Sequence, residues 1–242
     1  QPSDYIKNST IGFSIHAPEL FENDHILDLC SLDESYRKIS IKHLKRVIKH
    51  AKTISENFDQ KESPILVINA GGWNTDNFIS KDEKDTKYEI LKDSFSQVDL
   101  SQVRVAIQTM PPFPWHFGGQ SFHNLFVDPD EIVKFCEDTG LEVCLDVSHS
   151  MMACSYYGWD IIEFVSKISK HINYLHIVDA VGSDGEGVQI GNGDVDFEDL
   201  GKILGNKCKD VPFIPEIWQG HKNGGAAFWE ALEFLEPYFQ TK

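Results

Sequence analysis

The chain contains six short apolar runs that are rich in Val and Ile. Each run is five to seven residues long and nearly continuous in apolarity. This pattern is typical of strands that are buried on both faces of a parallel sheet. The runs span residues 11–17, 65–70, 103–109, 142–147, 174–178 and 212–217.

Stretches with helical spacing of apolar residues lie between these runs. The clearest example begins near residue 40, where apolar residues recur three or four positions apart. A later one begins at Asp128-Pro129, a favourable helix start, and stops at Gly140. The predicted helices span residues 40–58, 86–98, 129–139, 159–168, 197–204 and 226–239.

The alternation of strands and helices predicts right-handed crossovers and a parallel sheet, so the fold class is α/β. A closed TIM-type (β/α) barrel needs eight strand–helix units. Because few residues precede the first run, we expect a single barrel domain over residues 1–242 whose first two units are missing. The loops at 71–85 and 110–127 are long, and loops of this size on the carboxyl side of barrel strands are usually functional.

The charge of the chain disfavours polyanionic partners. The formal net charge is −16, with 38 acidic residues against 22 Lys and Arg. Such a surface repels nucleic acid and anionic membranes, so we expect neither as a partner. The densest basic stretch, residues 42–52, is typical of a solvated helix face. Five irregularly spaced cysteines and the lack of a signal peptide predict a cytoplasmic protein with reduced thiols.

Polar side chains lie near the carboxyl ends of four consecutive predicted strands. They are Gln108, Asp146, His176 and Glu216. The carboxyl ends of parallel strands meet at one rim, so we expect these four groups to converge. Two carboxylates, an imidazole and an amide oxygen suit a divalent metal such as Mn²⁺, Mg²⁺, Co²⁺ or Zn²⁺.

Each of these residues also has a simpler explanation. Asp146 could cap a helix, His176 could be structural, and Glu216 could pair with a lysine. Together they are harder to explain by packing, because each unpaired buried charge costs several kcal/mol. The sequence therefore predicts a metal or substrate site.

The segments SIHAPE, LVINAGG, CLDVSHS, YLHIVDA and PFIPEIW, in this order, resemble the sugar phosphate isomerase/epimerase family, among the xylose isomerase-like and AP endonuclease family 2 TIM barrels. The resemblance runs from about residue 11 to residue 238. It implies a TIM-type barrel and a metal-dependent isomerase or epimerase of sugars. Asp146, His176 and Glu216 match three of the usual four metal ligands, and Gln108 stands where the family has a glutamate.

The resemblance also implies catalytic roles. Glu216 is expected to double as the general base, and His149, in the DxxH pattern, to orient a substrate hydroxyl. The neutral Gln108 removes one of the two carboxylates that would move protons in an epimerase, which predicts a weaker site or different chemistry. An endonuclease IV-like hydrolase is less expected, because Asn69 and the segment 185–187 lack the residues of a trinuclear zinc cluster.

Two segments rich in aromatic residues, histidine and glycine suit a sugar, because rings stack on apolar sugar faces and imidazoles bind hydroxyls. They lie near residues 111–123 and 216–225. A loop that plugs the barrel mouth is the simpler alternative. The predicted substrate-binding residues are His16, Trp115, His116, Trp218, His221 and Lys222.

These two segments, together with CLDVSHS and GVQIGNGDVDFEDL, resemble a barrel domain that accompanies sialic-acid-synthase-like enzymes, which implies a role in surface-sugar (nonulosonic acid) biosynthesis. A fused or partner domain could then supply the missing strands, or the chain could form a homo-oligomer. The alternative function is a non-catalytic sugar-binding or regulatory barrel domain with a decayed metal site.

Overall fold

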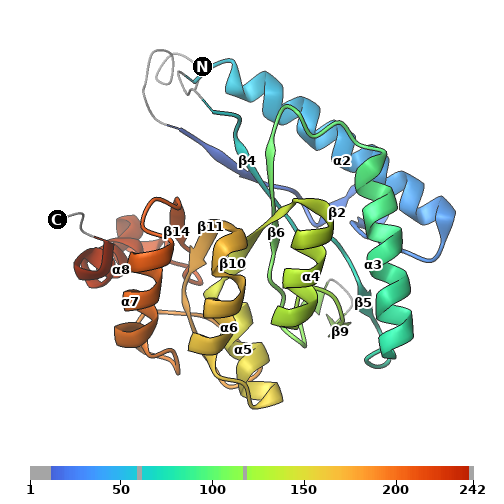
Figure 1. Cartoon of the computed structure of the whole chain (residues 1–242). Helices are drawn as coiled ribbons and strands as arrows, with labels where there is room; N and C mark the ends of the chain where they lie inside the picture. The colour runs from blue at the N-terminus through green and yellow to red at the C-terminus, as the bar shows by residue number, and fades with distance from the viewer. Residues whose placement is uncertain (1–11, 59–61, 117–118, 240–242) are drawn as a thin grey trace. The chain divides into compact units, whose positions relative to one another are not determined.

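The computed structural model describes residues 12–58, 62–116 and 119–239, and these residues form two compact units (Figure 1). The first unit comprises residues up to 72 together with 80–107, and the second comprises 73–79 together with the chain from 108. Within the described ranges, every helix is too short or too polar to cross a membrane. The expectation of one domain whose barrel is completed by other strands stays a prediction.

The first unit is built on parallel strands in the order β1, β4, β6. The strands are β1 (Ser14–His16), β4 (Ile65–Ile68) and β6 (Arg104–Gln108), whose last residue belongs to the second unit. All four residues of β4 are buried, as the continuous apolar run predicts. Its helices are α2 (Glu34–Ser55) and α3 (Lys81–Ser96).

Both helices of the first unit begin earlier than predicted. Asp33 caps α2 by accepting hydrogen bonds from the backbone N–H groups of Ser35 and Tyr36. Ser80 and Glu83 form a capping box at the start of α3. The first turns of these helices are polar, so a prediction based on apolar spacing starts too late.

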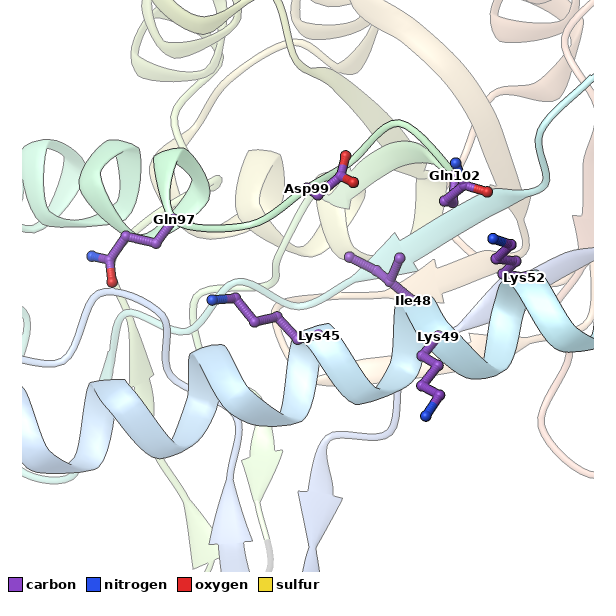
Figure 2. A pocket seen from close by; sticks show the side chains of 7 residues that line it. All are labelled: Lys45, Ile48, Lys49, Lys52, Gln97, Asp99 and Gln102. Atoms are coloured by element: carbon purple, nitrogen blue, oxygen red, sulfur yellow. The ribbon is translucent and has the colours of Figure 1, made fainter.

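The basic stretch on α2 is an exposed helix face, as predicted (Figure 2). Lys45, Lys49 and Lys52 line a groove of about 380 Å³. Figure 2 shows Lys49 extending away from the segment that carries Gln97 and Gln102. The groove is lined by a single carboxylate and by no imidazole, so its chemistry does not suit a metal site.

The second unit contains parallel strands in the order β10, β11, β14. They are β10 (Glu142–Asp146), β11 (Ile172–Ile177) and β14 (Phe213–Pro215). In Figure 1 the orange α7 and the red α8 lie side by side next to β14. Each of the six apolar runs therefore contains or overlaps a strand. The predicted helices correspond to α4 (Pro129–Thr139), α6 (Ile161–Ile168), α7 (Phe197–Lys207) and α8 (Lys222–Phe239).

One helix of the second unit is absent from the sequence prediction. Helix α5 (Val147–Tyr157) begins directly after β10, and Asp146 caps it by accepting a hydrogen bond from the His149 N–H. Its buried residues include polar Ser148 and Ser150 as well as apolar ones. The helix has no one-sided apolar stripe, so a search for helical spacing passes over it.

Short ordered pieces build the loops. Four antiparallel pairs occur among the described residues: β2 (Leu20–Phe21) with β3 (His25–Ile26), β5 (Trp73–Asn74) with β9 (Phe122–His123), β7 (Trp115–His116) with β8 (Gly119–Gln120), and β12 (Asp179–Val181) with β13 (Gly185–Val188). Two single-turn helices are η1 (Glu22–Asp24) and η2 (Ser169–His171). The long loop after β6 is thus ordered by two of these pairs.

Asp179 holds the loop that follows β13. Its carboxylate is buried and accepts hydrogen bonds from the backbone N–H groups of Ala180, Gly191, Gly193 and Val195. Removing it leaves several donors without a partner, and each such buried group costs about 1–3 kcal/mol. We expect Asp179→Ala to lower the free energy of unfolding by about 3 kcal/mol, measured by urea denaturation.

Asp196→Ala is the matched control for this prediction. Asp196 is exposed and accepts from the N–H groups of Glu198 and Asp199 at the start of α7. Loss of an exposed helix cap typically costs about 1 kcal/mol. Equal losses in the two variants would show that Asp179 acts as an ordinary surface acceptor.

Candidate functional site

The carboxyl ends of β10, β11 and β14 bring two carboxylates and an imidazole together. Asp146, His176 and Glu216 each offer a ligand atom, and these atoms lie within 4.8 Å of one another. His176 Nδ1 is 2.6 Å from Glu216 Oε2 and 3.4 Å from Asp146 Oδ2. The strand register explains the meeting, because Asp146 on β10 lies opposite His176 on β11.

Gln108, the last residue of β6, joins the same cluster. Its amide Nε2 donates a hydrogen bond to Asp146 Oδ2 at 2.8 Å and lies 3.2 Å from His176 Nδ1. The side chains of Gln108, Asp146 and His176 are buried, whereas the Glu216 side chain is 46% exposed. The structure therefore places all four predicted ligands in one cluster that reaches solvent at Glu216.

His149 lies against this cluster in the first turn of α5. Its Nδ1 is 2.9 Å from the carbonyl oxygen of Thr109 and 3.5 Å from Asp146 Oδ2. Its Nε2 is 3.1 Å from Oε1 of Glu186, which lies on β13. Asp146 therefore lies between two imidazoles, those of His149 and His176.

The charges of these neighbouring side chains strongly shift the pKa values of Asp146, His149 and His176. Burial alone would raise the pKa of the Asp146 carboxyl, but His149 and His176 outweigh burial and lower this pKa to about 2. Burial alone would lower the pKa of His149, but Asp146 and Glu186 raise it to about 10. The pKa of His176 is also raised despite its burial, because Cys144, Asp146 and Glu216 favour the charged form.

The donor set fits a divalent cation. Oxygen and imidazole nitrogen are the ligands that Mn²⁺, Co²⁺ and Zn²⁺ prefer, and three such atoms converge here. The carboxylates of Asp146 and Glu216 next to His176 Nδ1 favour a positive charge at this position. Either a proton on Nδ1 or a bound cation can provide that charge. Gln108 offers the neutral amide as a fourth group, and a half-turn of that amide would present its oxygen.

The predicted substrate contacts are placed in different ways. His16 belongs to the first unit, and its Nδ1 is 2.8 Å from the Ala17 carbonyl oxygen. Trp218 and His221 are exposed, and Lys222 donates a hydrogen bond to Gln219. The side chains of Trp115 and His116 lie outside the described residues. Their roles in substrate binding stay predictions.

Glu186 is the residue of this site that sequence reasoning missed. It stands between two glycines in a short segment without helical or strand periodicity. Only the pairing of β12 with β13 shows that this segment folds back toward α5. An acidic residue in a glycine-rich loop after a strand that ends in histidine is the one signal that could have indicated it.

Parallel strands with ligand-competent side chains at their carboxyl ends are typical of TIM-type α/β barrels. The family described as "Xylose isomerase-like TIM barrel" matches residues 3–238, and the chain belongs to this family. The predicted fold class is therefore confirmed.

Two solved structures share this fold, and one curated protein is similar in sequence. A crystal structure of a D-tagatose 3-epimerase-like protein is similar with a TM-score of 0.66 and 18% identity, covering 94% of this chain and 77% of that chain. A 3-keto-D-glucoside 4-epimerase from E. coli has a TM-score of 0.65 and 13% identity, covering 97% and 82%. An uncharacterized protein of Methanocaldococcus jannaschii is 24% identical over 240 residues, 93% of this chain and 69% of that protein.

Proposed function

We propose that the chain is a metal-dependent isomerase or epimerase that acts on a sugar or a sugar derivative. The observation that carries this proposal is the convergence of Asp146, His176 and Glu216 at the ends of three parallel strands. A bound Mn²⁺, Mg²⁺, Co²⁺ or Zn²⁺ would polarise a substrate carbonyl and so acidify the adjacent C–H bond. The 3-keto-D-glucoside 4-epimerase and the D-tagatose 3-epimerase-like protein, which share this fold, support this class of reaction.

The exposed and buried side chains of the site would have different roles. The half-exposed Glu216 carboxylate can reach a substrate and take the proton from the carbon next to the carbonyl. Asp146 is buried and accepts from the His149 N–H and the Gln108 amide, so it holds the site in place. His149 Nε2 faces Glu186, where it can share its hydrogen with a substrate hydroxyl.

One observation favours a second candidate, a non-catalytic sugar-binding domain with a decayed metal site. The Gln108 amide already donates to Asp146 and lies beside His176. A neutral donor at this place satisfies the carboxylate without a cation. Metal binding by the purified chain separates the two candidates.

The test is calorimetric titration of the chelator-treated chain with Mn²⁺, followed by a substrate panel monitored by NMR. We expect about one Mn²⁺ per chain and metal-dependent interconversion of at least one pair. The panel contains D-tagatose with D-sorbose, L-ribulose with L-xylulose, and N-acetylglucosamine with N-acetylmannosamine, which probes the surface-sugar role. As a control, Glu198→Gln on the exposed face of α7 should bind Mn²⁺ and interconvert the same pair as the wild-type chain. A chain that binds sugar but no Mn²⁺ would favour the decayed site.

A further inference from the structure

A second exposed carboxylate lies beside the cluster. Glu186 on β13 has a side chain that is 56% exposed, and its Oε1 is 3.1 Å from His149 Nε2. The roles given above to Asp146, His176 and Glu216 leave this carboxylate without a task. Its exposure makes it accessible to a small molecule that approaches His149 from solvent.

The backbone fixes the segment that carries Glu186. The N–H of Trp218 donates to the carbonyl of Gly187 at 2.9 Å, which ties β13 to the segment just after Glu216. A Cβ at residue 187 would approach the Trp218 Cβ to 3.0 Å, so glycine permits this close packing. Helix α5, which carries His149, also packs against β12 and β13. Glu186 is therefore held at the site.

Two half-exposed carboxylates thus flank a buried row of three residues. From Glu186 the row runs through His149, Asp146 and His176 to Glu216, with successive separations of 3.1, 3.5, 3.4 and 2.6 Å. The three inner side chains are buried, and the two outer ones reach solvent. Glu186 and Glu216 are therefore the two members of this row that a substrate can reach from solvent.

Inversion at a carbon requires removal of a proton from one face and delivery of a proton to the other. Gln108 cannot take either part, because its amide does not exchange protons as an acid or base. We propose that Glu186 is the second proton-transferring residue of the site, acting on the face opposite Glu216. This inference rests on the proposed function.

The step balances without an oxidant or a reductant. The Glu216 carboxylate takes the proton from the carbon next to the carbonyl, and the electron pair of the broken C–H bond forms an enediolate. The Glu186 side chain, which is 56% exposed, takes up a proton from solvent and delivers it to the other face of the same carbon, and the new C–H bond takes the pair back. Release of the Glu216 proton to solvent then restores both carboxylates for the next turnover.

The test uses Glu186→Gln, which keeps an oxygen that can accept from His149 but cannot carry the proton. Exchange of the substrate C–H proton is followed by NMR in D₂O with Mn²⁺ and each member of the active pair, beginning with D-tagatose and D-sorbose. The wild-type chain should exchange both members. In the variant, interconversion should fall about a hundredfold or more, and exchange should survive for only one member. A merely structural role would lower both exchanges equally.

Controls separate this inference from the proposed function. Asp184→Asn, an exposed acid of the same hairpin, should behave as the wild-type chain. The Mn²⁺ affinity of Glu186→Gln should stay within about twofold of wild type, because Glu186 is outside the ligand cluster. If the variant exchanges both members, or loses both exchanges equally, the proposed role of Glu186 is wrong. The proposed function of the chain is unaffected by that outcome. A wild-type chain that exchanges no pair of the panel overturns the proposed function.

Discussion

Replacement of Asp146 by alanine is expected to abolish Mn²⁺ binding and to lower the free energy of unfolding by about 4 kcal/mol. The change removes a predicted ligand, the cap of α5 and the anion between His149 and His176. Two buried imidazoles would then lose their shared counter-charge. Calorimetry with Mn²⁺ and urea denaturation of the same samples measure the two effects.

Asp160→Ala is a matched control for this variant. Asp160 caps α6 by accepting a hydrogen bond from the Glu163 N–H at 2.9 Å, the same contact that Asp146 makes with His149 at the start of α5. It is exposed, so its loss should cost about 1 kcal/mol and leave Mn²⁺ binding unchanged. Normal Mn²⁺ affinity in Asp146→Ala would remove the basis for the metal site.

The stabilisation by Asp146 should also depend on pH. Its carboxyl pKa is lowered from 3.8 to about 2 in the folded chain. A group with a lowered pKa stabilises the fold above its unfolded-state pKa, and this contribution is lost as the pH falls through the folded-state pKa. The difference in unfolding free energy between wild type and Asp146→Ala should therefore shrink between pH 4 and pH 2, by about 2 kcal/mol.

The strands could be predicted from the sequence because strands buried on both faces appear as nearly continuous apolar runs. All residues of β4 and β11 are buried; β4 lies within a predicted apolar run, and β11 overlaps one but begins two residues earlier. Helix α5 has no apolar stripe that would predict it, because its buried face includes serines and a histidine. The polar first turns of α2 and α3 hide their true starts for the same reason.

The candidate ligands could be predicted because parallel strands end at a common rim. The residue types at the ends of β6, β10, β11 and β14 then suffice to name Gln108, Asp146, His176 and Glu216. Glu186, on the β12–β13 hairpin, could not be predicted as a partner of His149. The short strands of this hairpin have no periodic pattern of apolar residues that would show where they fold. The sequence also cannot tell which end of the Gln108 amide faces Asp146.

Replacement of Gln108 by glutamate should convert the cluster into one that depends on a cation. The amide Nε2 now donates to Asp146 Oδ2 at 2.8 Å. A carboxylate at that place would set two like charges at hydrogen-bond distance, which disfavours the ionised pair. In the presence of a chelator, we expect the free energy of unfolding of Gln108→Glu to fall by about 3 kcal/mol at pH 7. The loss should be smaller at pH 5, where one of the two carboxyl groups can be protonated.

Saturating Mn²⁺ should reverse this loss, because a cation between the carboxylates turns their repulsion into attraction. The Mn²⁺ affinity of Gln108→Glu should exceed that of the wild-type chain about tenfold or more, about 1.4 kcal/mol for each factor of ten. Gln102→Glu, the same change on an exposed residue in the first unit, should alter neither quantity. A Gln108→Glu chain whose stability ignores both chelator and Mn²⁺ would contradict a cation site here. If the variant gains isomerase or epimerase activity that the wild-type chain lacks, Gln108 marks the step at which a catalytic barrel lost its metal chemistry.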